Sequence, residues 1–104
     1  MKDLDWKILK TLYEKKSITK AAEVLYVTQS ALTKRLKAIE QEWQIEVVIR
    51  TSKGVTFTDE GRYLAKKANI MLDFLEEIKE HLSSHQLSKE LLKIGVPNSF
   101  ARLH

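Results

Sequence analysis

Apolar residues recur at helical spacing in the first two segments of the chain. From Leu4 to Lys16 they stand three or four positions apart, as on one face of an α-helix. The N-cap of this helix is expected at Asp3 or Asp5, because a carboxylate can accept the free N–H groups of a first turn. Thr19 is predicted to cap a second, shorter helix that ends near residue 25.

A third segment follows a turn at residues 26 and 27, and it has one apolar face and one polar face. Thr28 is expected to cap a helix that ends at Glu42 or Trp43. Its apolar residues fall within about 60° of one another on a helical wheel and form the expected core face: Leu32, Leu36, Ile39 and Trp43. Its polar residues occupy a continuous exposed arc of about 140°: Gln29, Ser30, Thr33, Lys34 and Lys37. Two helices so close together predict a helix-turn-helix.

The pattern changes after residue 43. β-branched residues surround a Ser52-Lys53-Gly54 turn, which predicts a short hairpin, or wing. Thr58 then begins a long helix with acidic residues in its first turn. Further along, residues 92 to 96 are typical of a strand followed by a Pro-Asn turn. The expected fold class is therefore mainly α, a winged helix-turn-helix with a long C-terminal dimerisation (linker) helix.

Six apolar residues of the long helix are spaced as in a heptad repeat. They form the expected dimer interface: Leu64, Ala68, Met71, Leu75, Ile78 and Leu82. Other apolar residues flank this seam, and one helix cannot bury both surfaces by itself. We infer that the helix packs on the first helix and on its copy in a second subunit. The alternative is a single amphipathic helix folded back on its own domain.

Composition limits the classes of function that the chain can serve. Its 104 residues can bury one modest core, which does not suit a large enzyme with its own substrate cleft. Residues 1 to 57 hold 11 basic and 7 acidic side chains, whereas residues 58 to 104 hold seven of each, so the net charge of +4 lies in the first half. A polyanionic partner is favoured. Without cysteine, a signal peptide or an apolar span, we expect a cytoplasmic protein that does not contact membranes.

The polar arc of the third helix has the chemistry of a recognition helix. Glutamine can bond to an adenine edge, threonine to a base edge or a thymine methyl, and lysine to guanine or phosphate. Arginine and small polar residues at the hairpin can contact a phosphate or the minor groove. The expected contacts with double-stranded DNA are Thr19, Lys20, Thr28, Gln29, Ser30, Thr33, Lys34, Lys37, Arg50, Thr51, Ser52 and Lys53.

Two alternatives compete with this interpretation. The helices can form a protein-docking or dimerisation module that does not bind DNA, in which case the same polar residues are simply solvated. His81 and His85 are four positions apart and can place both imidazoles on one metal ion. They lack a third obvious ligand, so we favour solvated histidines. We expect no cofactor, no metal site, no catalytic residue and no enzymatic activity.

The sequence resembles the N-terminal domain of LysR-type bacterial transcriptional regulators over residues 4 to about 90. The shared features include the Ala21-Ala22 pair, the Thr28-Gln29 pair and Arg50, in the order and spacing of that family. The "FTDEG" sequence at the start of the long helix also matches. The chain departs from the family pattern at Ser30, where proline is frequent, and at Gln44, where glycine is common.

The resemblance implies a division into three parts. Residues 1–58 form a winged helix-turn-helix that binds an inverted-repeat operator as a dimer, and residues 59–88 form a linker helix that pairs antiparallel with its mate. Residues 89–104 begin an effector-binding domain, which would take a small-molecule inducer. The resemblance also allows a higher oligomer in the full-length protein.

Overall fold

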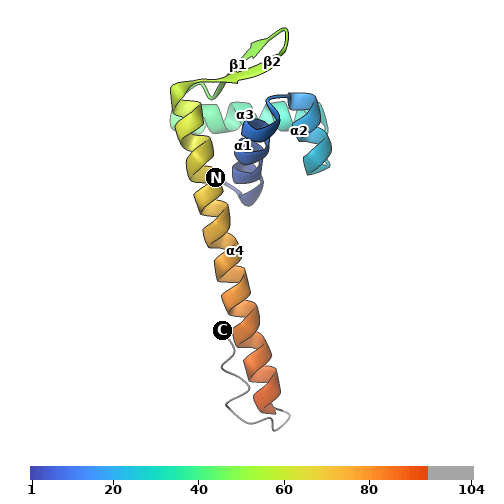
Figure 1. The fold of residues 1–104 in the computed structure, drawn as a ribbon, viewed down its shortest axis with the longest axis vertical. Coiled ribbons are helices and arrows are strands. Elements are labelled where there is room, and N and C mark those ends of the chain that lie inside the picture. The colour runs from blue at the N-terminus through green and yellow to red at the C-terminus, as the bar shows by residue number, and fades with distance from the viewer. Residues whose placement is uncertain (94–104) are drawn as a thin grey trace. The chain divides into compact units, whose positions relative to one another are not determined.

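The computed structural model describes the backbone of residues 1–93 and the side chains of residues 1–84. It divides into two units, Met1–Leu72 and the chain from Asp73 onward, which are described separately. The first unit holds three helices and an antiparallel hairpin, and α4 begins within it (Figure 1). In order, the elements are α1 (Asp3–Lys15), α2 (Ile18–Leu25), α3 (Gln29–Trp43), β1 (Val48–Thr51), β2 (Gly54–Phe57) and α4 (Asp59–Lys93).

Helix α1 begins one residue earlier than the sequence predicted, and neither aspartate is its N-cap. Lys2 occupies the N-cap position. Asp5 lies in the first turn, where its Oδ2 accepts the backbone N–H of Lys2 at 3.1 Å. The expectation of an aspartate cap was wrong because the helix already begins at Asp3, so Asp3 and Asp5 are its first and third residues rather than the residue before it. The helix ends at Lys15, and its C-cap Lys16 has a left-handed backbone with φ of 54°.

The predicted N-cap of α2 was also wrong. Ser17, rather than Thr19, caps this helix, and its Oγ accepts the backbone N–H of Lys20 at 3.2 Å. An N-cap side chain reaches the N–H two or three residues further on, and only the residue at the extended position before the helix can do so. Thr19 therefore lies inside the first turn, where it is exposed.

Helix α3 largely follows the prediction. Thr28 is its N-cap, as expected, and accepts the backbone N–H of Ala31 at 3.0 Å. Three of the four predicted core residues are buried, but Trp43 is 48% exposed. Trp43 is the last residue of the helix, so its ring extends past the packed part of the helix into a surface pocket. Gln44 then ends the helix with φ of 55°, the conformation for which glycine is more common.

The hairpin was predicted correctly and is attached to the end of α1. Strands β1 and β2 pair antiparallel, with Thr51 opposite Gly54 across a two-residue loop. The N–H of Val55 donates to the carbonyl of Lys16 at 3.1 Å. Gly54 has φ of 131°, and an added Cβ would stand 2.4 Å from the same carbonyl. Glycine is needed here on both counts.

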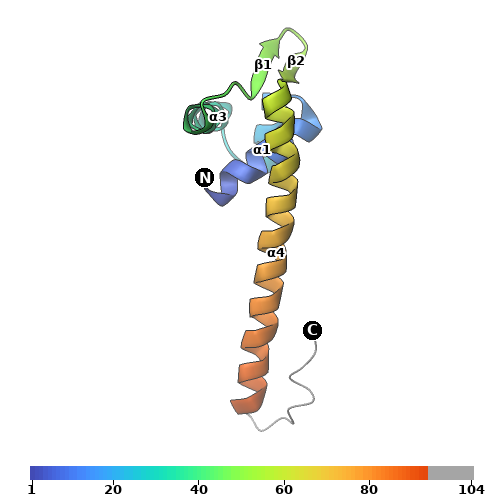
Figure 2. The ribbon, with the colours of Figure 1, turned by 90° about the vertical axis from the view of Figure 1, so that its left-hand side faces the viewer.

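The first unit has one apolar core, with buried members from α1, α2, α3, β2, the start of α4 and the segment before β1. Its buried members are Ile8, Leu9, Leu12, Ala21, Ala22, Leu32, Leu36, Ile39, Val47, Val55, Phe57, Leu64, Ala65 and Ala68. Leu64 and Ala68 were expected at a dimer interface, yet they are 8% and 0% exposed in this core. These two positions of the predicted seam therefore pack within the core of the first unit, and Leu64 also lines a surface pocket described below. Figure 2 views α3 nearly end-on beside α1.

The long helix begins as predicted and continues further than expected. Thr58 Oγ1 accepts the N–H of Gly61 at 3.0 Å, and acidic residues occupy the first turn. The helix reaches Lys93, beyond the expected end at residue 88. Leu92 and Lys93 are therefore helical, and the prediction of a strand from residue 92 was wrong for these two residues. The rest of that predicted strand, residues 94 to 96, lies outside the described residues.

Candidate nucleic-acid interface

The polar arc of α3 and one strand of the hairpin line a shallow concave surface, and the hollow that it encloses has a volume of about 490 Å³. We call this surface the recognition face. It is lined by Gln29, Ser30, Thr33, Lys34, Lys37 and Arg50. Five of these side chains are exposed and Thr33 is half-buried. All six were predicted DNA contacts, and the structure brings them together on one surface.

The N-terminal end of α3 supplies the uncharged polar groups of this face. Thr28 uses its hydroxyl oxygen to cap the helix, so that Gln29 and Ser30 start the first turn with free, exposed side chains. The positive end of the helix dipole lies at the same place and favours anions. Lys34 and Lys37 follow one and two turns later. The face therefore offers hydrogen-bonding groups at one end and ammonium groups along its length.

Arg50 on β1 contacts the recognition helix directly. Its Nη2 donates a hydrogen bond to Thr33 Oγ1 at 2.9 Å. The sequence predicted Arg50 as a phosphate or minor-groove contact and did not predict this bond, because the two residues are 17 positions apart. The bond joins the hairpin to the exposed side of α3.

The other predicted contacts lie outside the recognition face. Thr51, Ser52 and Lys53 are exposed at the hairpin loop, where Thr51 Oγ1 accepts the N–H of Lys53 at 3.3 Å. Thr19 and Lys20 are exposed in the first turn of α2. These residues do not line the concave surface with α3, and they present polar or cationic groups at two other places on the first unit.

Arg35 does not belong to the recognition face, although it lies between two lysines that do. Its Nε donates to Asp5 Oδ1 at 3.0 Å, and its Nη2 donates to Asp5 Oδ2 at 2.8 Å. Burial alone would raise the pKa of the Asp5 carboxyl. The hydrogen bonds from Arg35 and from the backbone of Lys2, with the Arg35 charge, outweigh burial and lower that pKa below its ordinary value.

Sequence reasoning missed this ion pair, although a signal for it was present. Asp5 stands three, four and seven positions before Ile8, Leu9 and Leu12, and so lies on the apolar face of α1. A carboxylate on a core-facing stripe requires a cationic partner. Arg35 is the corresponding cation on α3, and the pair joins α1 to the recognition helix.

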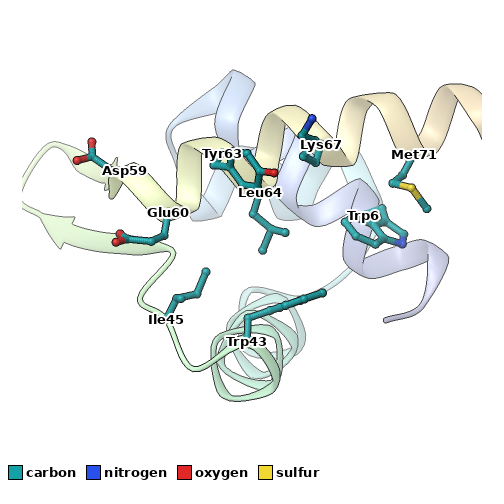
Figure 3. A pocket seen from close by; sticks show the side chains of 9 residues that line it. All are labelled: Trp6, Trp43, Ile45, Asp59, Glu60, Tyr63, Leu64, Lys67 and Met71. Atoms are coloured by element: carbon teal, nitrogen blue, oxygen red, sulfur yellow. The ribbon is translucent and has the colours of Figure 1, made fainter.

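A second, mostly apolar pocket of about 660 Å³ lies on the first unit. Trp6 from α1 and Trp43 from the end of α3 extend toward one another across it, and Leu64 points into it from α4 (Figure 3). Ile45 lines its floor, whereas Glu60, Tyr63, Lys67 and Met71 line the α4 side. We call this space the tryptophan pocket.

Within the side chains that the structure describes, no three histidine, cysteine or acidic residues gather closely enough to hold a metal ion. His85, one member of the predicted histidine pair, lies outside those side chains. None of the helices in the described residues combines the length and the apolar content that crossing a bilayer requires.

Known proteins resemble this chain in sequence and in fold. The family described as "Bacterial regulatory helix-turn-helix protein, lysR family" matches residues 4–62. An uncharacterised HTH-type transcriptional regulator of Bacillus subtilis, YraN, is 44% identical over 105 residues, which cover 98% of this chain and 36% of YraN. The chain thus spans little more than a third of this relative.

Solved structures give the same result. The BenM DNA-binding domain in complex with catB site 1 DNA superposes with a TM-score of 0.76 and 25% identity, over 80% of this chain and 93% of that one. Full-length LysG from Corynebacterium glutamicum, with its effector Arg bound, gives a TM-score of 0.74 and 27% identity, over 86% of this chain and 30% of LysG.

Proposed function

Because this chain belongs to the lysR family of bacterial regulatory helix-turn-helix proteins, we propose that it binds double-stranded DNA in a sequence-specific manner and regulates transcription. Helix α3 enters the major groove, and the hairpin lies beside it as a wing. The observation that carries this proposal is the recognition face, where amide, hydroxyl and cationic groups from α3 and β1 line one concave surface.

Binding to duplex DNA at two salt concentrations distinguishes this proposal from its alternative. Phosphate contacts release counterions, so affinity for DNA should fall steeply as salt rises. A protein-docking module without DNA binding would show no such interaction. We would measure it by fluorescence anisotropy with operator DNA chosen from a random pool. No binding to any duplex in dilute buffer would contradict the proposal.

Gln29 and Lys34 have different roles on the recognition face. Gln29→Ala should weaken binding to the preferred sequence by about 1 to 3 kcal/mol and flatten the preference at one base pair, because an amide reads a base edge. Lys34→Ala should weaken all sequences alike, because an ammonium on phosphate carries no sequence information. Repeating the selection with each variant separates the two effects. If Gln29→Ala keeps the same consensus and the same affinity, the Gln29 amide does not read a base.

We further propose that the chain acts as a dimer in which a second copy occupies the tryptophan pocket. The first unit exposes Trp43 and Tyr63 at this pocket, and the second unit exposes Phe74, Ile78 and Leu82. Exposed apolar side chains at such a density are unusual on a monomer. The apolar residues after position 72 of the partner are the occupants that we propose for the pocket.

Charge along α4 favours an antiparallel arrangement of the two copies. Residues 62–72 contain three basic and no acidic side chains, whereas residues 73–84 contain four acidic side chains and one lysine. Antiparallel copies place the basic segment of one against the acidic segment of the other. Parallel copies would place like charges together.

A charge-reversal experiment tests this arrangement. Lys66→Glu with Lys67→Glu makes both segments acidic and should weaken the homodimer about tenfold at low salt, because attractive pairs become repulsive. Glu76→Lys with Glu77→Lys makes both segments basic and should do the same. An equimolar mixture of the two variants should form a heterodimer, measured by sedimentation. Homodimers of undiminished stability in either double variant would contradict antiparallel pairing.

In this arrangement the dimer places two copies of α3 on an inverted repeat, which a two-fold symmetric consensus from the random pool would support. The assignment of residues 89–104 to an effector-binding domain remains a proposal. The same holds for a small-molecule inducer and for a higher oligomer of a longer protein.

A further inference from the structure

The hydrogen bond between Arg50 and Thr33 affects which base the recognition helix can read. Arg50 Nη2 donates to Thr33 Oγ1 at 2.9 Å. A threonine hydroxyl has one hydrogen to donate and two lone pairs that accept. The guanidinium has only donors, so it must occupy a lone pair of Thr33 and leave the hydroxyl hydrogen for another acceptor.

The remaining hydrogen is available at the recognition face. In a helix, a threonine hydroxyl frequently donates to the carbonyl four residues earlier. In the described part of the chain, Thr33 makes its side-chain hydrogen bond with Arg50, and the carbonyl of Gln29 is not its partner. The Thr33 hydroxyl lines the concave surface beside Gln29 and Lys37. It can therefore donate outward to a bound molecule.

The strand that carries Arg50 is anchored to the core before any ligand arrives. Arg50 stands opposite Val55 in the hairpin. Val55 is buried, and its N–H is held by the carbonyl of Lys16 at the end of α1. The strand that carries Arg50 is thus anchored through its partner strand to the core. The strand is therefore held in place without DNA, and from it the guanidinium reaches Thr33 on α3.

We propose that Arg50 is a specificity-determining residue that acts through Thr33. By occupying one of the two acceptor sites of the hydroxyl, Arg50 leaves Thr33 with one hydrogen and one lone pair, and so shifts it toward donating into the major groove. Thr33 then favours base edges that accept, such as guanine N7 and O6, adenine N7 or thymine O4, over the amino group of cytosine. This inference rests on the proposed DNA binding, and it gives Arg50 a role that a phosphate contact alone does not have.

A matched pair of wing variants separates the two roles of Arg50. Arg50→Met and Lys53→Met each remove one positive charge from the hairpin, and both should weaken DNA binding. Only Arg50→Met should also reduce discrimination at one base pair, by about three- to tenfold. That base pair should be the one at which Thr33→Val loses its preference, whereas Thr33→Ser should retain it. Selection of bound DNA from a random pool, followed by titration of single-base variants, measures the base preference of all four protein variants.

The decisive comparison uses the double variant that combines Arg50→Met with Thr33→Val. In the Thr33→Val background, Arg50→Met should cause no further change in base preference, because its effect requires the hydroxyl. If Arg50→Met weakens every sequence equally and leaves the Thr33 base pair unchanged, Arg50 is only a phosphate contact and the inference is wrong. Absence of duplex binding by the unmodified protein would instead contradict the proposed function itself. Circular dichroism of each variant checks that the fold is retained.

Discussion

Gly61→Ala is expected to destabilise the protein by about 3 kcal/mol. An alanine in place of an interior helical glycine ordinarily stabilises a helix by about 1 kcal/mol. Here an added Cβ would stand 2.0 Å from the carbonyl oxygen of Val47 and 2.8 Å from its carbonyl carbon. These are backbone atoms, so no side-chain rotation can relieve the overlap.

The contact at Gly61 is held from several directions. Thr58 N–H donates to the carbonyl of Val47 at 3.0 Å, and the N–H of Val47 donates to Glu40 Oε2 at 2.7 Å. Val47 itself is fully buried. An alanine at position 61 must therefore displace the start of α4 from a segment that is bonded to both α3 and α4. The substitution therefore weakens both the core packing around Val47 and these hydrogen bonds.

Urea denaturation of Gly61→Ala beside Asn69→Ala measures this effect. Asn69 is an exposed residue of the same helix. Its replacement by alanine should change stability by less than about 1 kcal/mol, in the stabilising direction. If Gly61→Ala is as stable as the unmodified protein, the close approach of α4 to Val47 does not exist in solution.

The sequence was sufficient for the features that depend on local periodicity. The core face of α3 through Ile39, the Thr28 cap and the position of the hairpin each follow from residues close together in the chain. The recognition face could be predicted for the same reason, since five of its six residues belong to one helix. Arg50 was predicted as a DNA contact from its chemistry beside the turn.

The features that sequence reasoning did not place depend on contacts between distant segments. Asp5 was expected to be a local cap, but its partner Arg35 is 30 positions away. Leu64 and Ala68 fit a heptad, yet a heptad pattern does not say whether a position faces its own core or a second chain. Trp43 fits the core stripe of α3, but the stripe continues past the point where the neighbouring helices stop covering it.

Asp5→Ala is the second change for which we expect a large effect, a loss of about 3 kcal/mol at neutral pH. The Asp5 carboxylate is 1% exposed and accepts two hydrogen bonds from Arg35 and one from the backbone of Lys2. Its removal leaves a cation beside the core without its partner. The Arg35 side chain is 35% exposed, so water can replace part of the lost interaction, and we place the loss at the lower end of the range for buried pairs.

The pH dependence of this loss follows from the lowered pKa of Asp5. Because the folded state holds the carboxyl below its ordinary value of 3.8, the unfolded chain takes up a proton first as pH falls. The stabilisation from Asp5 is therefore complete above this ordinary value. It is lost as pH falls from there through the folded pKa.

The measurement compares unfolding free energies of the unmodified protein, Asp5→Ala and Asp3→Ala between about pH 7 and about pH 2.5. Asp3 is an exposed acid in the same first turn, and its replacement should cost less than about 1 kcal/mol. The difference in unfolding free energy between the unmodified protein and Asp5→Ala should be constant near neutrality and should narrow only in acid. A gap that stays constant down to the lowest pH would show that the carboxylate charge contributes nothing, and that Asp5 acts only by filling space between α1 and α3.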